Sequence, residues 1–195
     1  MESATTNADK KLFSSSLRGD LEGVVDALAQ GGRVTMRNSQ GFTPLLAAAE
    51  AGHTNICGLL LAHGSDVNEV TLKAKYTALH HAAVKGHEAV VEALLSWGAI
   101  VDPQDHLGGT PLYAACQGGH LACVLALLKA RASVSMPDND GHLPIHIAAH
   151  KNRVETVSTL LDYGCSLDMV SCRDNTSTTM IIPVSYTHLT LPTKA

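Results

Sequence analysis

Aromatic and charged side chains are both scarce in this chain. Aromatic residues make up 4% of its 195 residues and charged residues 16%, below the share of about a quarter that is usual in globular domains. Hydrophobic residues reach 45%, which is too high for a disordered chain. A core with few rings and many small aliphatic side chains favours closely packed helices over a sandwich of sheets.

The chain also lacks long apolar runs. The best of them covers residues 56–62 and includes a glycine, far short of the roughly 20 residues of a membrane-spanning helix. Residues 1–20 contain no apolar run typical of a signal peptide. The net charge of -4 argues against nucleic acid or an anionic membrane as the main partner. Five cysteines, an odd number without repeated spacing, argue against a disulfide framework, so we expect an intracellular protein.

The sequence is dominated by a repeat. Thr43, Thr77, Thr110 and Leu143 stand at equivalent places, in steps of 33 or 34 residues, and each is followed by an alanine-rich segment and a second apolar run. A more divergent copy begins near Leu12. The four clear copies are GFTPLLAAAEAGH at 41–53, KYTALHHAAVKGH at 75–87, GGTPLYAACQGGH at 108–120 and GHLPIHIAAHKNR at 141–153.

Each copy has the signals of two short helices joined by a tight turn. Threonine followed by proline suits the start of a helix, because the hydroxyl can accept a backbone N–H and proline fits the first helical position. Paired alanines allow neighbouring helices to approach closely. Glycines such as Gly52 and Gly86 supply the left-handed residue that ends the first helix. One unit cannot bury its own apolar stripe, so the units must stack into a solenoid.

The T-P-L-H-x-A pattern and the G-H pair between the helices resemble the ankyrin repeat. The resemblance covers roughly residues 10–170 and implies an all-α solenoid of stacked helix-turn-helix units with hairpin loops. We expect an N-terminal extension at residues 1–9, followed by repeats at approximately 10–37, 38–71, 72–104, 105–137 and 138–170. Residues 171–183 would begin a truncated sixth repeat. Residues 184–193, VSYTHLTLPT, resemble a translated sequencing-library adapter, so we expect 184–195 to be a non-native tail.

Three residues depart from the repeat at positions where glycine is expected. Lys75 takes the place of the hairpin glycine, and one extra residue precedes it, so this hairpin should differ in shape from the others. Arg131 replaces the glycine that closes a second helix, and Asn152 replaces the one that closes a first helix.

We find no pattern of catalytic or metal-ligating residues. His146 and His150 stand four residues apart on an expected helix, but no H-E-x-x-H motif or third ligand accompanies them. The histidines of the repeat, including His53, His87 and His120, are expected to bond backbone groups between repeats. Neither a phosphate-binding loop nor a G-x-S-x-G nucleophile motif is present. The sequence therefore predicts a protein that is not an enzyme and holds no cofactor or metal.

The resemblance implies partner binding on a concave surface made by the hairpin tips and the outer side of the first helices. Phe42 and Tyr76 hold equivalent places just before two helix starts, and with Leu107 they could form an apolar strip. Alternatively, each ring lies flat on its own hairpin. The full set of candidate partner-binding residues is Ser39, Gln40, Phe42, Glu50, Lys73, Tyr76, Lys85, His106, Leu107, Gln117, Asn139, Asp140, His142, His150 and Lys151.

The most direct interpretation is a non-catalytic scaffold or adaptor that docks a protein partner and works as a monomer in the cytoplasm or nucleus. The alternative is the substrate-recognition arm of a longer protein, such as a ubiquitin-ligase adaptor, a kinase or a channel. The resemblance also implies that Asn68, in the D-V-N context of a hairpin, is a substrate of an asparaginyl hydroxylase. Basic residues form no stripe, so nucleic-acid binding is disfavoured.

Overall fold

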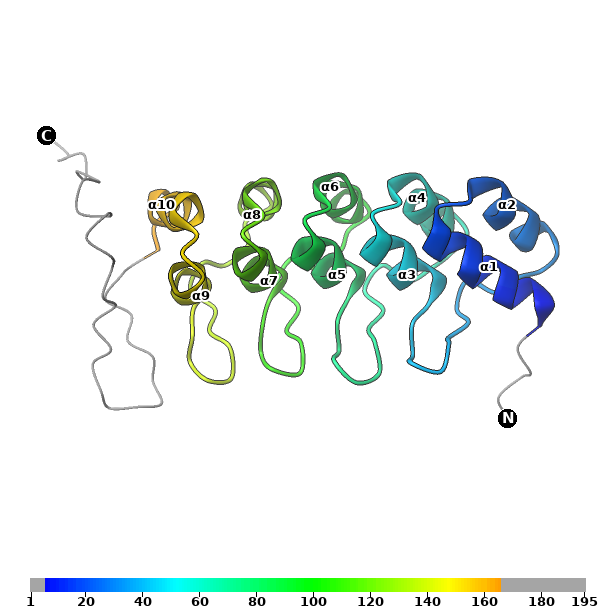
Figure 1. Cartoon of the computed structure of the whole chain (residues 1–195), viewed down its shortest axis with the longest axis horizontal. Helices are drawn as coiled ribbons and strands as arrows, with labels where there is room; N and C mark the ends of the chain where they lie inside the picture. The colour runs from blue at the N-terminus through cyan, green and yellow to red at the C-terminus, as the bar shows by residue number, and fades with distance from the viewer. Residues whose placement is uncertain (1–5, 166–195) are drawn as a thin grey trace, which may run out of the picture.

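The computed structural model describes residues 6–165, which form ten helices in five antiparallel pairs (Figure 1). The first helix of each pair belongs to an inner row and the second to an outer row. The helices are α1 (Asn7–Arg18), α2 (Leu21–Ala29), α3 (Pro44–Ala51), α4 (Thr54–Ala62), α5 (Ala78–Lys85), α6 (Glu88–Ser96), α7 (Pro111–Gly118), α8 (Leu121–Lys129), α9 (Pro144–His150) and α10 (Val154–Asp162).

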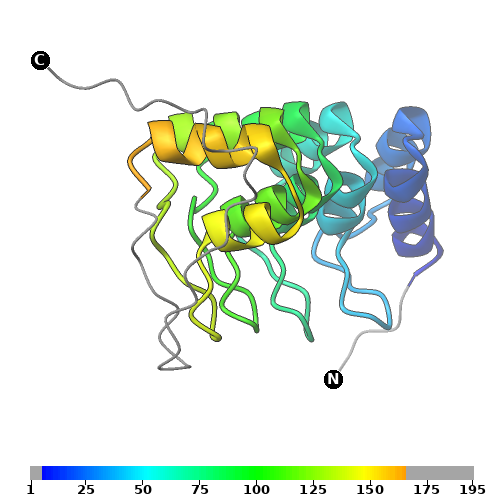
Figure 2. The ribbon, with the colours of Figure 1, turned by 60° about the vertical axis from the view of Figure 1, so that its left-hand side comes forward.

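Successive pairs stack side by side, so each helix contacts the equivalent helix of the next pair. A hairpin precedes each of α3, α5, α7 and α9, and all four hairpins project from the inner row on the same side (Figures 1 and 2). The hairpins are closed by backbone hydrogen bonds, such as the one from Asn38 N–H to Phe42 O (2.9 Å). The expected all-α solenoid is confirmed.

The inner helices begin as the sequence predicts. Thr43 and Thr110 cap α3 and α7, where their hydroxyls accept the backbone N–H of the third helical residue at 3.4 and 3.2 Å, and proline follows both. At the start of α9, Leu143 has no hydroxyl, and the Nδ1 atom of His146 accepts the Leu143 N–H instead (3.0 Å). Here the side chain of the third helical residue accepts the backbone N–H of the residue before the helix, whereas in the threonine caps the residue before the helix accepts from the third helical residue.

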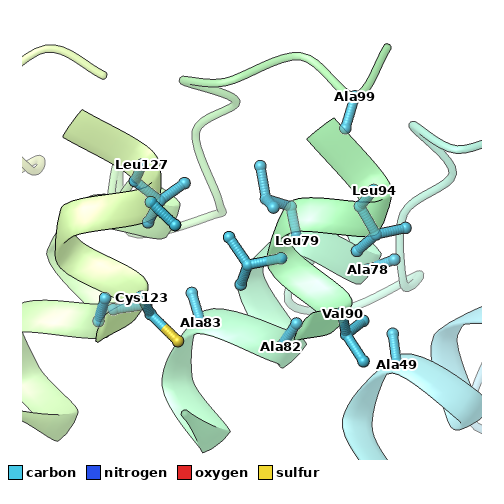
Figure 3. Close-up of a cluster of buried hydrophobic side chains, with 14 of the residues drawn as sticks. Ala49, Ala78, Leu79, Ala82, Ala83, Val90, Leu94, Ala99, Cys123 and Leu127 are labelled. Carbon is cyan, nitrogen blue, oxygen red and sulfur yellow. The ribbon is translucent and has the colours of Figure 1, made fainter. Parts of the chain in front are cut away.

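The core is built from small side chains pressed between neighbouring repeats. Ala48, Ala82, Ala115 and Ala148, which hold the same place in four inner helices, are all fully buried. Leucines such as Leu94 of the outer row close the core. Figure 3 shows the part around α5 and α6, to which α3 contributes Ala49 and α8 contributes Cys123 and Leu127. Because methyl groups let the helix backbones approach closely, the stack is continuous and needs no aromatic centre.

The three departures from glycine all adopt left-handed backbone conformations, with φ of 54° at Lys75, 66° at Arg131 and 56° at Asn152. The hairpin that contains Lys75 differs from the others, as expected. It closes with a bond from Thr71 N–H to Tyr76 O (2.9 Å), which spans one residue more than the corresponding bonds elsewhere.

The first helix begins at Asn7, three residues before the expected start of the array at residue 10. Thr6 caps it, and the Asp9 carboxylate accepts the Thr6 N–H in return (2.9 Å). Asp9 is fully buried and also accepts hydrogen bonds from the backbone and guanidinium of Arg33, the latter at 2.6 Å. These side-chain bonds from Arg33 hold the pKa of Asp9 well below its ordinary value. The capping box and this ion pair tie the start of the chain into the first repeat.

The expected truncated sixth repeat at 171–183 and the expected non-native tail at 184–195 lie outside the described residues. Within residues 6–165, none of the helices combines the length and the apolar character that crossing a membrane requires.

Candidate partner-binding surface

The histidines of the G-H turns bind the repeats together. The Nε2 atoms of His53, His87 and His120 donate to backbone carbonyls of the preceding repeat at 3.2, 3.0 and 3.1 Å. His80 does the same toward the following repeat, with its Nε2 donating to the carbonyl of Gly109 (3.1 Å). The structural role expected for these imidazoles is confirmed, and they are occupied within the fold.

The hairpin tips are also joined to one another, which the sequence did not reveal. The backbone N–H of His106 donates to the carbonyl of Ala74 (3.0 Å), and that of Asn139 donates to the carbonyl of Leu107 (2.8 Å). The side-chain amide of Asn139 adds a bond to the carbonyl of His106 (3.1 Å). The tips of the third, fourth and fifth repeats therefore form one continuous ledge, which we call the hairpin ledge.

The candidate residues predicted from the sequence divide into two groups by exposure. Most of them are exposed, at the hairpin tips and near the ends of the inner helices, and three are half-buried. Leu107 is the most exposed apolar residue among them, at 60%. The exposed group is Ser39, Gln40, Lys73, Lys85, His106, Leu107, Gln117, Asn139, Asp140, His142, His150 and Lys151, and the half-buried group is Phe42, Glu50 and Tyr76.

Phe42 and Tyr76 both contact His81, a residue that the sequence analysis did not single out. The Phe42 ring centroid lies 5.0 Å from that of His81, and the Tyr76 ring meets His81 edge-on at 5.4 Å. Tyr76 also stacks on His80 at 5.2 Å. The two aromatic residues are therefore linked through an imidazole of α5. Phe42 bridges two repeats, since it leaves its own hairpin to reach His81.

His81 is nearly buried, and its Nε2 atom has no hydrogen-bond partner among the described residues. A buried polar group without a partner costs roughly 1–3 kcal/mol. Burial lowers the pKa of His81 to about 4, although the nearby Glu50 carboxylate opposes the shift, so the imidazole is neutral at pH 7. A comparison of equivalent positions could have found it, because the other clear repeats carry Ala47, Ala114 and Ile147 there.

Charge differs from one hairpin to the next, although the turn geometry is shared. The Oδ1 atom of Asn38 accepts two backbone N–H groups of its hairpin, both at 2.9 Å. The carboxylates of Asp105 and Asp138 do the same in their hairpins, at 2.7 and 2.9 Å and at 3.0 and 2.8 Å. The turn thus needs an oxygen acceptor and not a charge. Burial, reinforced by Asp138, raises the pKa of Tyr113 beside these hairpins.

The hairpin position of Asn68 connects two repeats. Its Oδ1 atom accepts the backbone N–H of Ile100 (2.9 Å), and the carboxylate of Asp102 accepts that of Ser133 one repeat later (3.0 Å). Asn68 is half-buried in this position. Its hydroxylation stays a prediction.

The described residues contain no group of His, Cys, Asp and Glu side chains that could hold a metal ion. The cysteines of this region, Cys57, Cys116, Cys123 and Cys165, are all buried. Burial raises the pKa of Cys57 to about 12 and that of Cys123 to about 11, so both are protonated thiols at pH 7. These thiols act as small apolar residues of the core and not as nucleophiles.

Comparison with known proteins agrees with this architecture. The family model for ankyrin repeats in three copies matches residues 12–105 and 98–171. The chain belongs to the ankyrin-repeat family. Members of this family generally serve as protein-interaction modules and are typically non-catalytic.

Several curated relatives share part of the array. Over 109 residues the chain is 38% identical to the Caenorhabditis elegans "Ankyrin repeat and KH domain-containing protein mask-1", in an alignment that covers 55% of this chain and 4% of the relative. The human "Ankyrin repeat and KH domain-containing protein 1" is 36% identical over 107 residues, with 54% and 4% covered. Yeast "Protein HOS4" is 34% identical over 110 residues, with 56% and 10% covered. The chain therefore spans a tenth or less of the length of these larger proteins.

Proposed function

We propose that this array is a non-catalytic scaffold or adaptor module that binds a protein partner on its concave face. The face consists of the hairpin ledge and the exposed side of the inner helices. Support comes from the contrast, within each repeat, between residues that build the stack and residues that stay exposed. Caps, alanines and turn histidines are used to build the stack, whereas the side chains along this face vary from repeat to repeat and are largely exposed.

The exposure of Leu107 carries the proposal. Its backbone carbonyl accepts a hydrogen bond within the hairpin ledge, while 60% of the residue faces solvent at the tip. An apolar side chain held on a rigid tip gains free energy when a partner covers it. Gln117 of α7 and His150 of α9 extend the same exposed face onto the inner helices.

A site-specific photo-crosslinker tests this proposal in cells that express the protein. A benzophenone amino acid at Gln117 is expected to capture protein partners. The same group at Glu92, an exposed position of the outer helix α6, serves as the matched control. Equal capture of the same proteins from both positions, or none from Gln117, would contradict binding on the concave face.

The second candidate is a substrate-recognition arm of a longer protein, such as a ubiquitin-ligase adaptor, a kinase or a channel. The short share of each relative that the chain covers favours it. Sequencing the transcript beyond the codon for Pro183 tests it, because a continuing reading frame would reveal the effector part. In either case we propose a monomer of the cytoplasm or nucleus. We also propose Asn68 as a hydroxylation substrate, to be tested by mass spectrometry for one added oxygen.

A further inference from the structure

The third repeat carries a polar side chain that the fold does not require. His81 lies on α5 between the rings of Phe42 and Tyr76, is 7% exposed, and leaves its Nε2 atom without a partner in the described part of the chain. Alanine occupies the same position in the second and fourth repeats, as Ala47 and Ala114. The stack forms around a methyl group there. The unpaired Nε2 atom therefore costs folding free energy that stacking does not require, although the ring itself packs against Phe42 and Tyr76.

Three lysines accompany His81 on the concave side of the same repeat. Lys73 and Lys75 are exposed on the hairpin that leads to Tyr76, and Lys85 follows His81 by one helical turn on α5. Residues four apart on a helix lie on the same side, so His81 and Lys85 are neighbours. We call the set Lys73, Lys75, His81 and Lys85 the repeat-3 strip.

The second repeat shows that the architecture does not need these residues either. At the positions equivalent to Lys73, Lys75 and Lys85 it carries Ser39, Gly41 and Ala51. Lys75 is held at φ 54°, a conformation that suits glycine better than lysine. The positive charge of the strip is therefore an addition to the repeat, and at Lys75 it is kept despite backbone strain.

We propose that the repeat-3 strip binds an acidic segment of a protein partner, whose carboxylates are held by the ammonium groups of Lys73, Lys75 and Lys85. This inference rests on the proposed function and specifies the chemistry of the bound segment. Each lysine ammonium donates charge-assisted hydrogen bonds to a carboxylate. The Nε2 atom of His81 is closed off from solvent in the free protein and adds a bond only if a neighbouring ring turns aside. Lys73 and Lys75 attract further acidic residues along the hairpin.

The charges that oppose this binding are few. Glu50 lies 3.4 Å from Lys85, but the two side chains are 34% and 50% exposed, and ion pairs this exposed are weak enough to exchange partners. Asp105 of the next hairpin accepts hydrogen bonds from two backbone N–H groups of its own turn, but it keeps its charge, helps to raise the pKa of the neighbouring Tyr76 and opposes an anion at this edge of the strip. Beyond it, Asp138 and Asp140 repel a long polyanion. A short acidic peptide segment therefore fits the face better than a nucleic acid, which would span the acidic hairpins as well.

The test replaces the strip with the residues that repeat 2 carries at the same places. The variant Lys73→Ser, Lys75→Gly, His81→Ala, Lys85→Ala converts one repeat into the surface of its neighbour. A displayed library of random peptides is selected separately on the full wild-type chain and on this variant. Peptides from the wild type are expected to be enriched in Asp and Glu and to bind the variant at least tenfold more weakly.

Two control variants separate the strip from charge in general. Lys129→Ala removes an exposed lysine of the outer helix α8 and should leave peptide affinity unchanged. Lys73→Arg with Lys85→Arg keeps the charge and should keep binding within about threefold. Circular dichroism establishes that the variants are folded. If the four-residue variant is unfolded, Lys73→Ser with Lys85→Ala, which changes only exposed side chains, must still weaken binding.

Each outcome is decisive. Selected peptides without acidic enrichment, or with equal affinity for wild type and variant, would overturn the acidic specificity while leaving a peptide-binding concave face intact. Failure to select any peptide would count against both. A mobility shift of single-stranded RNA or duplex DNA at 0.15 M salt that is lost in the variant would replace the acidic peptide by a nucleic acid and overturn the proposal.

Discussion

Replacing Arg131 by glycine should stabilise the protein, because Arg131 adopts a left-handed backbone conformation that suits glycine. Arg131 is one of three left-handed non-glycine residues in the described part of the chain, at φ 66°, and its N–H donates to Leu128 O (2.9 Å). Gly31 and Gly98 make the same bond at the ends of their helices, both at 3.0 Å. A Cβ atom added at either glycine would meet nothing within 4 Å. These positions therefore require glycine for its backbone conformation and not for lack of space.

The magnitude follows from two opposing terms. The left-handed conformation costs a residue with a Cβ roughly 1–2 kcal/mol. Glycine loses more backbone entropy on folding, which takes back about 0.5–1 kcal/mol. The Arg131→Gly variant should therefore gain about 0.5–1 kcal/mol, a rise in Tm of roughly 1–4 °C for a chain of this size. Thermal unfolding followed by circular dichroism at 222 nm measures this directly.

The control is Arg131→Ala, which removes the exposed guanidinium but keeps the Cβ atom. It should leave the Tm unchanged or slightly lower. If alanine and glycine raise the Tm equally, the effect comes from the charge of the side chain, and the argument from backbone strain is wrong. A Tm unchanged or lowered by Arg131→Gly would also refute it.

Two further predictions concern contacts between repeats and within the first one. Gly86 and Gly98 have the same φ of 81°, but a Cβ atom at Gly86 would lie 2.5 Å from Nδ1 of His120, whereas at Gly98 it would meet nothing within 4 Å. Urea unfolding should show Gly86→Ala to be more destabilising than Gly98→Ala by at least about 1 kcal/mol, because the hydrogen bond from His120 to the carbonyl of Val84 is lost as well. Equal losses in the two variants would show that only backbone strain matters. Asp9→Asn should lower the Tm at pH 7, because Arg33 depresses the pKa of Asp9 in the folded state. This contribution is complete above the unfolded pKa of about 4 and shrinks as the pH falls below it, so wild type and variant should differ less at pH 3. A difference that does not shrink would argue against the ion pair.

The repeats of this protein differ from one another at a few equivalent positions. Asn38 and Asp138 make the same turn with and without a charge. Ala47 and His81 occupy the same place on an inner helix, but only His81 introduces a polar group that the stack leaves unpaired. Comparison of equivalent positions within one chain therefore separates residues that build the repeat from residues that the repeat does not require.

The sequence predicted those parts of the structure that depend on local geometry. Thr43 and Thr110 cap helices, the hairpin that contains Lys75 differs from the others, and the G-H histidines bond the adjoining repeat, all as expected. Each of these follows from a short motif whose conformation is set within a few residues, and repetition at a constant step makes the motif visible.

The candidate site was only partly accessible from sequence. The sequence marks Phe42 as an unusual aromatic residue. Its contact with His81 joins two repeats and cannot be inferred from the sequence of either repeat alone. The bonds between hairpin tips, such as Asn139 N–H to Leu107 O, likewise depend on how closely successive hairpins stack. The pairing of Asp9 with Arg33, 24 residues away, likewise depends on how the first repeat folds back on itself.

Local sequence signals are sufficient for the unit, its period and its turns, because caps, alanine pairs and left-handed glycines act over a few residues of chain. Which polar groups are hydrogen-bonded depends on how the repeats stack. His87 donates a hydrogen bond to a carbonyl of the preceding repeat, and Asp9 pairs with Arg33. The Nε2 atom of His81 has no hydrogen-bond partner among the described residues, and the ring contacts Phe42 and Tyr76. The same residue type can thus be hydrogen-bonded within the fold or left unpaired, because hydrogen bonding of a buried group depends on neighbours that stacking brings together.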